Sequence, residues 1–172
     1  TGLDNGHADS IDRAFQDCAK AASDPARSVS GAAAQDAALR DGMQIPTNHA
    51  ESAMSYVDGF VVPVPKDKLA DYRKIARRAG KVWMEHGALA YTECVADDVP
   101  VGKHTSFPQS VKLKEGEVVV FSWIVYASRR ERDRINKLVM ADPRLQDLMT
   151  PQAMPFDGKR MFFGGFKEIV KF

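Results

Sequence analysis

Hydrophobic residues recur with two different periods along residues 54–172, and the two periods alternate. Runs rich in β-branched and aromatic residues predict strands, whereas apolar residues that recur every three or four positions predict helices. The predicted elements are strands over 56–62, 88–96, 117–126 and 160–170 and helices that begin at 66 and 128. Their order along the chain is β-α-β-β-α-β.

Turn and capping residues mark the ends of these elements. Pro63 and Pro65 are expected to close the first strand, because proline lacks the N–H that a sheet ladder needs. Gly87 follows the first helix at the position where a left-handed residue commonly ends a helix. Ser128 opens the S-x-x-E spacing of a capping box, which predicts the start of the second helix. Residues 103–116 show neither period and are expected to be irregular.

This order of elements predicts an α+β, ferredoxin-like fold. Two βαβ halves then wind into one four-stranded antiparallel sheet with both helices on one face. The other face of the sheet, rich in aromatic and β-branched residues, is left with nothing between it and solvent. An apolar face of this size is rarely left exposed to solvent, so we expect either residues 1–53 or a second copy of the chain to cover it. We favour a homodimer that packs sheet to sheet.

Composition divides the chain into two unlike segments. Residues 1–53 hold four basic and eight acidic residues, a net charge of −4, and are rich in alanine with Phe15 as their one aromatic residue. The remaining 20 basic and 15 acidic residues give residues 54–172 a net charge of +5. Those residues also hold the large apolar side chains, so they form the domain. Residues 1–53 are expected to be a helical or irregular N-terminal extension, with short helices over 11–22 and 30–42.

The charge and the motifs exclude several classes of function. The near-neutral total charge of +1 gives no reason to expect nucleic acid or an anionic membrane as a partner. No apolar run approaches the roughly 18 residues of a membrane span, and we expect a cytoplasmic protein. The two cysteines and four histidines show no metal-ligand spacing, and neither a P-loop nor a G-x-G-x-x-G occurs. We therefore expect no metal and no cofactor.

Two acidic residues, Asp58 and Glu93, lie inside predicted strands, where acids are depleted. A carboxylate held in an apolar pocket has a raised pKa and can act as a general base. The alternative is an acid at a sheet edge or a dimer seam, paired with an arginine. His86, at the end of the first helix, is a candidate proton shuttle, or else a core residue stabilised by the helix C-terminus.

Four further residues are candidates for the wall of a ligand pocket between the sheet and its helices. Tyr91 shares a strand face with Glu93, because side chains alternate along a strand. Ser122 and Trp123 could line an apolar cavity with one polar contact, and packing in the core or a dimer interface is the alternative for Trp123. His104 lies in a glycine-containing loop where a pocket rim would be, or is simply solvated.

Several motifs of residues 54–172 resemble the DUF1428 (YbaA-like) family, a set of small bacterial proteins of unknown function. They are MSYVDGFVV at 54–62, GAL at 87–89, EC at 93–94, DVP at 98–100, VVFSW at 119–123, DPR at 142–144, MPFDGKRM at 154–161 and GGF at 164–166. The resemblance implies the dimeric α+β barrel, in agreement with the fold predicted above. Family members typically begin at a Met equivalent to Met54. Residues 1–53 therefore depart from the pattern, as an N-terminal extension, a start assigned too early, or foreign sequence joined to the domain.

The leading hypothesis for function is a homodimer that binds a small, largely apolar molecule between sheet and helices. The superfamily implied by the resemblance holds cofactor-free monooxygenases, haem-degrading enzymes and ligand-binding modules. If the protein is an enzyme, we expect cofactor-independent proton abstraction or oxygenation, with Glu93 or Asp58 as base, His86 as shuttle and Trp123 as wall. The alternative is a non-catalytic protein-interaction module. RNA association is the third hypothesis and rests on the basic run at 129–134. Acidic residues interrupt this run, which is typical of a solvated, salt-bridged helix face and makes RNA binding the weakest of the three.

Overall fold

The structure is a computed structural model, and it describes residues 54–150 and 153–172. In chain order the elements are β1 Tyr56–Pro65, the 3₁₀ turn η2 Lys66–Lys68, α2 Leu69–Glu85, β2 Ala90–Val95, α3 Phe107–Ser110, β3 Glu117–Tyr126, α4 Arg129–Met140, α5 Pro143–Gln146, the 3₁₀ turn η3 Gly158–Arg160 and β4 Phe162–Lys167. The expected N-terminal extension, with its helices over 11–22 and 30–42, lies outside the described residues. None of the described helices is long and apolar enough to cross a membrane.

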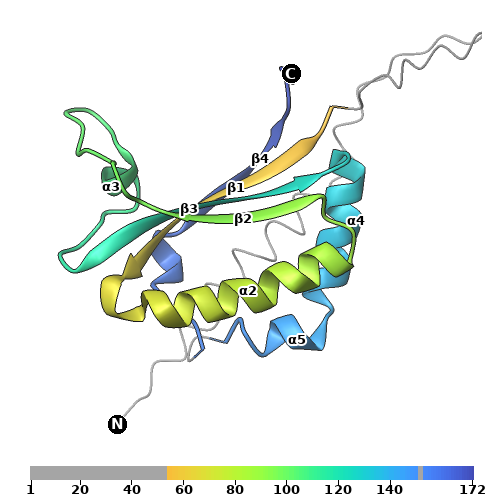
Figure 1. The fold of residues 1–172 in the computed structure, drawn as a ribbon, viewed down its shortest axis with the longest axis horizontal. Helices are drawn as coiled ribbons and strands as arrows, with labels where there is room; N and C mark the ends of the chain where they lie inside the picture. Colours follow the sequence, from red (N-terminus) through yellow and green to blue (C-terminus); the bar gives the residue numbers. More distant parts are fainter. Residues whose placement is uncertain (1–53, 151–152) are drawn as a thin grey trace, which may run out of the picture.

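The four strands form one antiparallel sheet in the order β2-β3-β1-β4. Figure 1 shows α2, α4 and α5 together on one side of this sheet. Helices on one face of an antiparallel sheet, with the chain order β-α-β-β-α-β, define a ferredoxin-like arrangement. The predicted α+β fold class is therefore confirmed.

Strand β1 is longer than the prediction and contains both prolines expected to end it. It pairs with β4 only as far as Val61, and beyond that residue only β3 lies alongside it among the described strands. Pro63 and Pro65 therefore occupy a stretch of β1 with one sheet neighbour, where a missing N–H is tolerated. Residues 103–116 also differ from the prediction, since they include the one-turn helix α3.

Hydrogen bonds confirm the predicted helix ends. Gly87 has a φ of 109°, in the left-handed region that favours glycine, and the next N–H, of Ala88, donates to the Trp83 carbonyl at 3.0 Å. These bonds satisfy carbonyls at the end of α2 that have no partner within the helix. At the start of α4, the Ser128 hydroxyl accepts from the N–H of Glu131 at 3.1 Å, which is the N-cap bond of the predicted capping box. The Glu131 carboxylate accepts from Nε of Arg134 at 2.9 Å.

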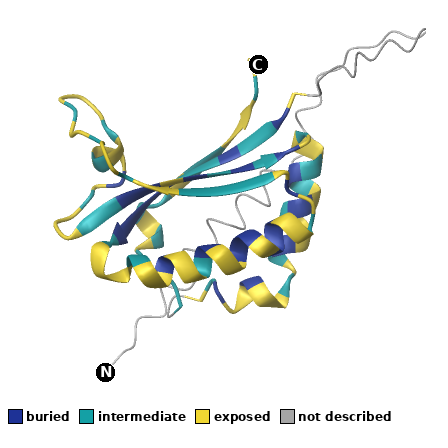
Figure 2. Cartoon of the chain, in the orientation of Figure 1, coloured by how far each residue is buried: buried dark blue, intermediate teal, exposed yellow. Residues whose placement is uncertain are grey.

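The core lies between the sheet and the helices, and buried residues of α2 lie on the side of the helix that faces the sheet (Figure 2). Side chains from β1 and β3 meet those of α2, α4 and α5 there, and each buried large apolar side chain contributes roughly 1.5–3 kcal/mol. The buried residues of this layer are Val62, Val64, Tyr72, Ala76, Ala79, Val82, Trp83, Ala88, Val120, Ile124, Tyr126, Ile135, Val139 and Leu145. A smaller cluster, Val61, Val111 and Val119, brings the 103–116 loop against the sheet.

The sheet face that points away from the helices, here called the open face, is largely apolar. Strand register and alternation place on it Val57, Gly59, Val61, Pro63, Pro65, Ala90, Thr92, Cys94, Glu117, Val119, Phe121, Trp123, Val125, Phe162, Gly164 and Phe166. The charged residue among them, Glu117, lies at the start of β3 and is paired with Arg160. The Phe121 side chain is 40% exposed, and Phe166 is 61% exposed. Within the described residues, the 103–116 loop covers only one end of this face.

An ion pair between Arg160 and Glu117 joins the segment before β4 to the start of β3. The guanidinium donates to both carboxylate oxygens, at 2.7 and 2.5 Å, and also to the carbonyl oxygen of Lys112 at 3.1 Å. Both side chains are nearly buried. The segment held in this way carries Phe156 and Met161, which line the cavity described below.

The Arg160 pair predicts a loss of stability in acid. The hydrogen bond from Arg160 lowers the pKa of Glu117 to about 2, below its usual 4.5. The stabilisation is therefore complete above pH 4.5 and is lost as the pH falls toward 2. Glu117→Gln should cost roughly 1–3 kcal/mol of unfolding free energy at pH 7. Urea unfolding should show this difference shrinking at pH 3. Glu115→Gln, an exposed acid of the same loop, is the control, and a difference independent of pH would contradict the prediction.

Candidate functional site

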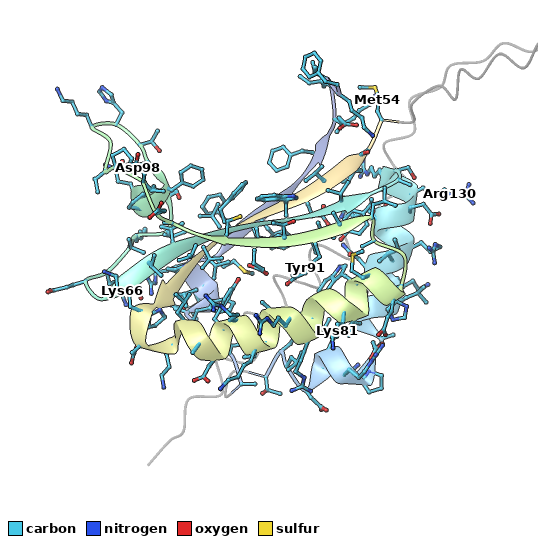
Figure 3. The ribbon with its side chains drawn as sticks, viewed as in Figure 1. Met54, Lys66, Lys81, Tyr91, Asp98 and Arg130 are labelled. Carbon is cyan, nitrogen blue, oxygen red and sulfur yellow. The ribbon has the colours of Figure 1, made fainter. Side chains whose placement is uncertain are left out.

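A cavity of about 100 Å³ lies between the sheet and the helices α2 and α5. Most of its wall is apolar and comes from all the surrounding elements: Phe60, Val62, Ile75, Ala76, Ala79, Trp83, Ile124, Leu145, Leu148, Met149, Met154, Phe156 and Met161. The polar residues of the wall are Tyr72, Tyr91, Glu93 and Ser122. Tyr91 lies in the space between β2 and α2 (Figure 3). A second hollow, a groove of about 430 Å³ between α2 and β2, also reaches Tyr72, Tyr91 and Glu93.

Glu93 is the acid at the centre of the polar group. Its Oε2 accepts a hydrogen bond from the Tyr72 hydroxyl at 2.8 Å, and its Oε1 accepts one from the Tyr91 hydroxyl at 2.7 Å. The Ser122 hydroxyl is a third hydrogen-bonding group beside the carboxylate. Each carboxylate oxygen can accept two hydrogen bonds, so these three hydroxyl groups leave Glu93 able to accept one more.

Strand register and a glycine bring these groups together. Glu93 of β2 pairs with Ser122 of β3, which pairs in turn with Phe60 of β1, so the three side chains form one row facing the helices. Tyr91 lies two residues before Glu93 and therefore points to the same face. A Cβ at Gly80 of α2 would lie 2.8 Å from the Tyr91 ring, so only glycine lets this ring approach the helix so closely.

Burial dominates the electrostatics of Glu93. It raises the carboxyl pKa, while the hydrogen bonds from Tyr91, Tyr72 and Ser122 lower it, and the result is a pKa above the usual 4.5. No cation is among the groups that act on this pKa. Burial, together with the neighbouring carboxylate, also raises the pKa values of Tyr72 and Tyr91. Both phenols therefore keep their protons and serve as donors, and Glu93 is the group of the three that can exchange a proton.

Asp58, the other strand acid, lies on the same sheet face but belongs to a different network. Its Oδ2 accepts from the Asn136 side-chain amide at 3.2 Å, and its Oδ1 lies 3.6 Å from Nε of Arg132. Burial raises the Asp58 pKa, and Arg132 opposes this rise. Asp58 does not line the cavity. Its contacts match the alternative of an acid paired with an arginine, and they attach α4 to β1.

The structure separates the remaining predicted residues from the cavity. His86 ends α2, with its Nε2 atom 3.1 Å from Oδ2 of Asp142. His104 is exposed in the loop before α3. Trp123 pairs with Gly59 and Thr92 on the open face, because neighbouring strand residues point to opposite sides of the sheet. It therefore forms no part of the wall that Ser122 lines.

Tyr72, a buried residue of α2, is not among the residues predicted for the site. The signal that could have identified it is its phenol, because a buried tyrosine hydroxyl usually finds a hydrogen-bond partner. The described residues contain no group of three or more His, Cys, Asp or Glu residues placed to hold a metal ion. At Glu93 a desolvated carboxylate lies beside neutral hydroxyl donors, which is the setting of a general base.

The pKa of Glu93 provides a direct test of this geometry. In protein labelled with ¹³C at the glutamate carboxyl, the Glu93 resonance should titrate above pH 4.5. Tyr72→Phe removes a donor that stabilises the charged form, so the pKa should rise further. The Tyr56 hydroxyl contacts Arg132 and not Glu93, so Tyr56→Phe should leave the Glu93 pKa unchanged. A Glu93 pKa at or below 4.5 would show that burial does not dominate.

Comparisons with known proteins identify relatives over the same part of the chain. The profile of the family described as "Protein of unknown function (DUF1428)" matches residues 55–158. The uncharacterised protein YbaA of Escherichia coli K12 is 52% identical over 117 residues, which cover 68% of this chain and 98% of YbaA, and YbaA of Shigella flexneri gives the same values. A solved structure, the de novo designed protein Foldit4, covers 68% of this chain and 99% of its own at 10% identity, with a TM-score of 0.34. The match of the family profile and the identity to YbaA show that this chain belongs to the DUF1428 family.

Proposed function

We propose that the protein binds a small, largely apolar molecule in the cavity at Glu93 and that Glu93 removes a proton from it. The observation that carries this proposal is a desolvated carboxylate in the wall of an apolar cavity, held by two tyrosine hydroxyls. Ligand sites are typically apolar hollows with a few converging polar groups. A perturbed titratable group inside such a hollow further favours a functional site.

The proton transfer can be written with the groups present. A C–H bond next to a ligand carbonyl breaks, its proton moves to a free lone pair of Glu93, and its electron pair delocalises onto the carbonyl oxygen to form an enolate. Neutralising Glu93 frees Tyr72 and Tyr91 to donate to that new oxyanion. Return of the proton to another carbon completes an isomerisation. A cofactor-independent oxygenation shares the first step and consumes dioxygen as a co-substrate.

Only part of the predicted catalytic set supports this function. Of the predicted catalytic residues, Glu93 lines the cavity, whereas Asp58 and His86 do not. Two of the predicted pocket residues, Tyr91 and Ser122, line it as well. The proposal therefore assigns the proton to Glu93 alone and needs no histidine shuttle. The apolar wall of the cavity comes from the sheet, from the helices and from the segment that contains Phe156.

A general-base probe tests the proposal. 5-Nitrobenzisoxazole is a small aromatic C–H acid that is larger than the cavity alone and would extend past Glu93 into the groove. It loses its proton to a base while its N–O bond breaks, and the product is a coloured phenolate. The full chain should accelerate this reaction, with a rate that rises as the pH passes through the Glu93 pKa. Glu93→Gln should reduce the acceleration roughly 10²–10⁴-fold. Glu115→Gln should leave it unchanged. No acceleration, or an acceleration that survives Glu93→Gln, would overturn the proton-transfer proposal.

We further propose that the open face is the interface of a homodimer. Exposed aromatic residues gather there: Phe121 lies 5.4 Å from Trp123 and 5.8 Å from Phe107, measured between ring centroids. The charged strand residue on this face, Glu117, lies at the end that the 103–116 loop covers and is paired with Arg160, so over the rest of the face two copies can meet around a twofold axis without opposing like charges. Depletion of charge and enrichment in aromatic residues are also the composition of an interface core.

Light scattering coupled to gel filtration measures the proposed dimer. The full chain should elute with the mass of two copies, and Phe121→Asp should convert it to a monomer, because the new charge would be buried without a partner. Leu138→Asp, at an exposed apolar residue of α4, should leave the dimer intact. A monomeric parent protein would overturn the proposal. It would leave the open face to residues 1–53 or to a different protein, as the interaction-module alternative requires.

A further inference from the structure

The groove between α2 and β2 continues from the cavity on the other side of Glu93. The two hollows share Tyr72, Ala76, Tyr91 and Glu93 in their walls. The groove is the larger of the two, about 430 Å³ against about 100 Å³. A bound molecule longer than the cavity would therefore pass Glu93 and extend into the groove.

The groove differs from the cavity in carrying two cationic side chains. Arg73 and Arg77 lie four residues apart on α2, on the same side of the helix, and both are exposed and line the groove. Within residues 54–150 and 153–172, neither arginine forms a salt bridge with a carboxylate. Lys74, between them in sequence, is instead paired with Asp71 at 3.1 Å.

Glu93 does not neutralise these arginines. Its carboxylate is held by the two tyrosine hydroxyls and Ser122, and no cation contributes to its pKa. The site thus combines an apolar interior, a buried acid at the boundary and two guanidinium groups along the outer groove. Guanidinium groups recognise carboxylates through charge-assisted hydrogen bonds, often two at a time.

We infer that the ligand of this site is an anionic amphiphile whose apolar part enters the cavity and whose carboxylate binds Arg73 and Arg77 in the groove. This inference rests on the proposed function, since it concerns the same site. The size of the cavity supports it: an apolar cavity of roughly 150 Å³ is known to hold benzene, so one of about 100 Å³ takes a short alkyl segment and not a long chain. The remainder of the molecule then lies in the groove.

Charge also fixes the orientation of such a ligand. A carboxylate pushed into the cavity would lose its hydration without gaining a cation, and it would oppose the Glu93 carboxylate. In the opposite orientation the carboxylate of the ligand remains hydrated in the groove beside Arg73 and Arg77, and the apolar carbons of the ligand face Glu93. The arginines would thereby determine which part of the ligand the general base reaches.

Octanoate and its uncharged analogue octanamide test the inference by calorimetric titration of the full chain. Octanoate should bind about ten-fold more tightly than octanamide at low salt, and this preference should shrink as salt is added. The double variant Arg73→Gln/Arg77→Gln should lose the preference while keeping the affinity for octanamide. Arg78→Gln, on the same helix but outside both hollows, should keep the preference.

Each other outcome is decisive. If both compounds bind equally to the parent protein, the anionic ligand class is wrong and the apolar site of the proposed function stands. If the preference persists in the double variant, Arg73 and Arg77 are not the anion site. If neither compound binds, the apolar ligand site itself is overturned, and this inference falls with it.

Discussion

The pairing of β3 with β1 on one side and β2 on the other decides on which face of the sheet each candidate strand residue lies. Side chains alternate along each strand, so this register sorts the sheet into two faces of different character. The row of Glu93, Ser122 and Phe60 faces the helices, and the next row, which contains Trp123, faces away. A shift of one residue in this register would exchange the two sets completely. The apolar layer under α2 makes such a shift costly, since it would move Val120 and Ile124 out of the core.

Two buried carboxylates on one sheet face have different surroundings, and these surroundings separate their roles. Asp58 has an arginine and an amide as neighbours, so its charge is compensated and its position is fixed against α4. Glu93 has only neutral hydroxyl donors, so its charged form is satisfied in hydrogen bonds but remains poorly solvated. Removing the partner of a compensated buried charge costs stability, which is typical of structural ion pairs. An uncompensated acid beside a cavity is the group available for chemistry.

The sequence supports prediction of the fold because each element carries a local signal. Helical and strand periods, the capping serine at Ser128 and the glycine at Gly87 depend on neighbouring residues alone. Strand alternation likewise predicts that Tyr91 and Glu93 share a face. The contact of Tyr72 with Glu93 joins a helix to a strand, and it depends on how α2 is rotated over the sheet. The residues next to Tyr72 in sequence do not determine how α2 is rotated over the sheet. That rotation depends in part on the close approach of Gly80 to Tyr91, a residue eleven positions away in the sequence. The position of Pro63 and Pro65 inside β1 could not be predicted from neighbouring residues either. The strand accommodates these prolines because β4 stops pairing with β1 at Val61.

The two faces of the sheet also explain how assembly and ligand binding can coexist in a domain of this size. The open face is largely apolar and carries exposed aromatic residues, whereas the hollows at Glu93 lie on the helix side of the same strands. β2 is an edge strand, and the groove runs between it and α2, so a partner seated on the open face would not close the groove. The two sites nevertheless share a backbone, because Ser122 at the cavity and Trp123 on the open face are consecutive residues of β3. Whatever covers the open face therefore holds the strand that supports Glu93, and rigid support of this kind keeps a reactive side chain within the narrow range of positions that chemistry requires.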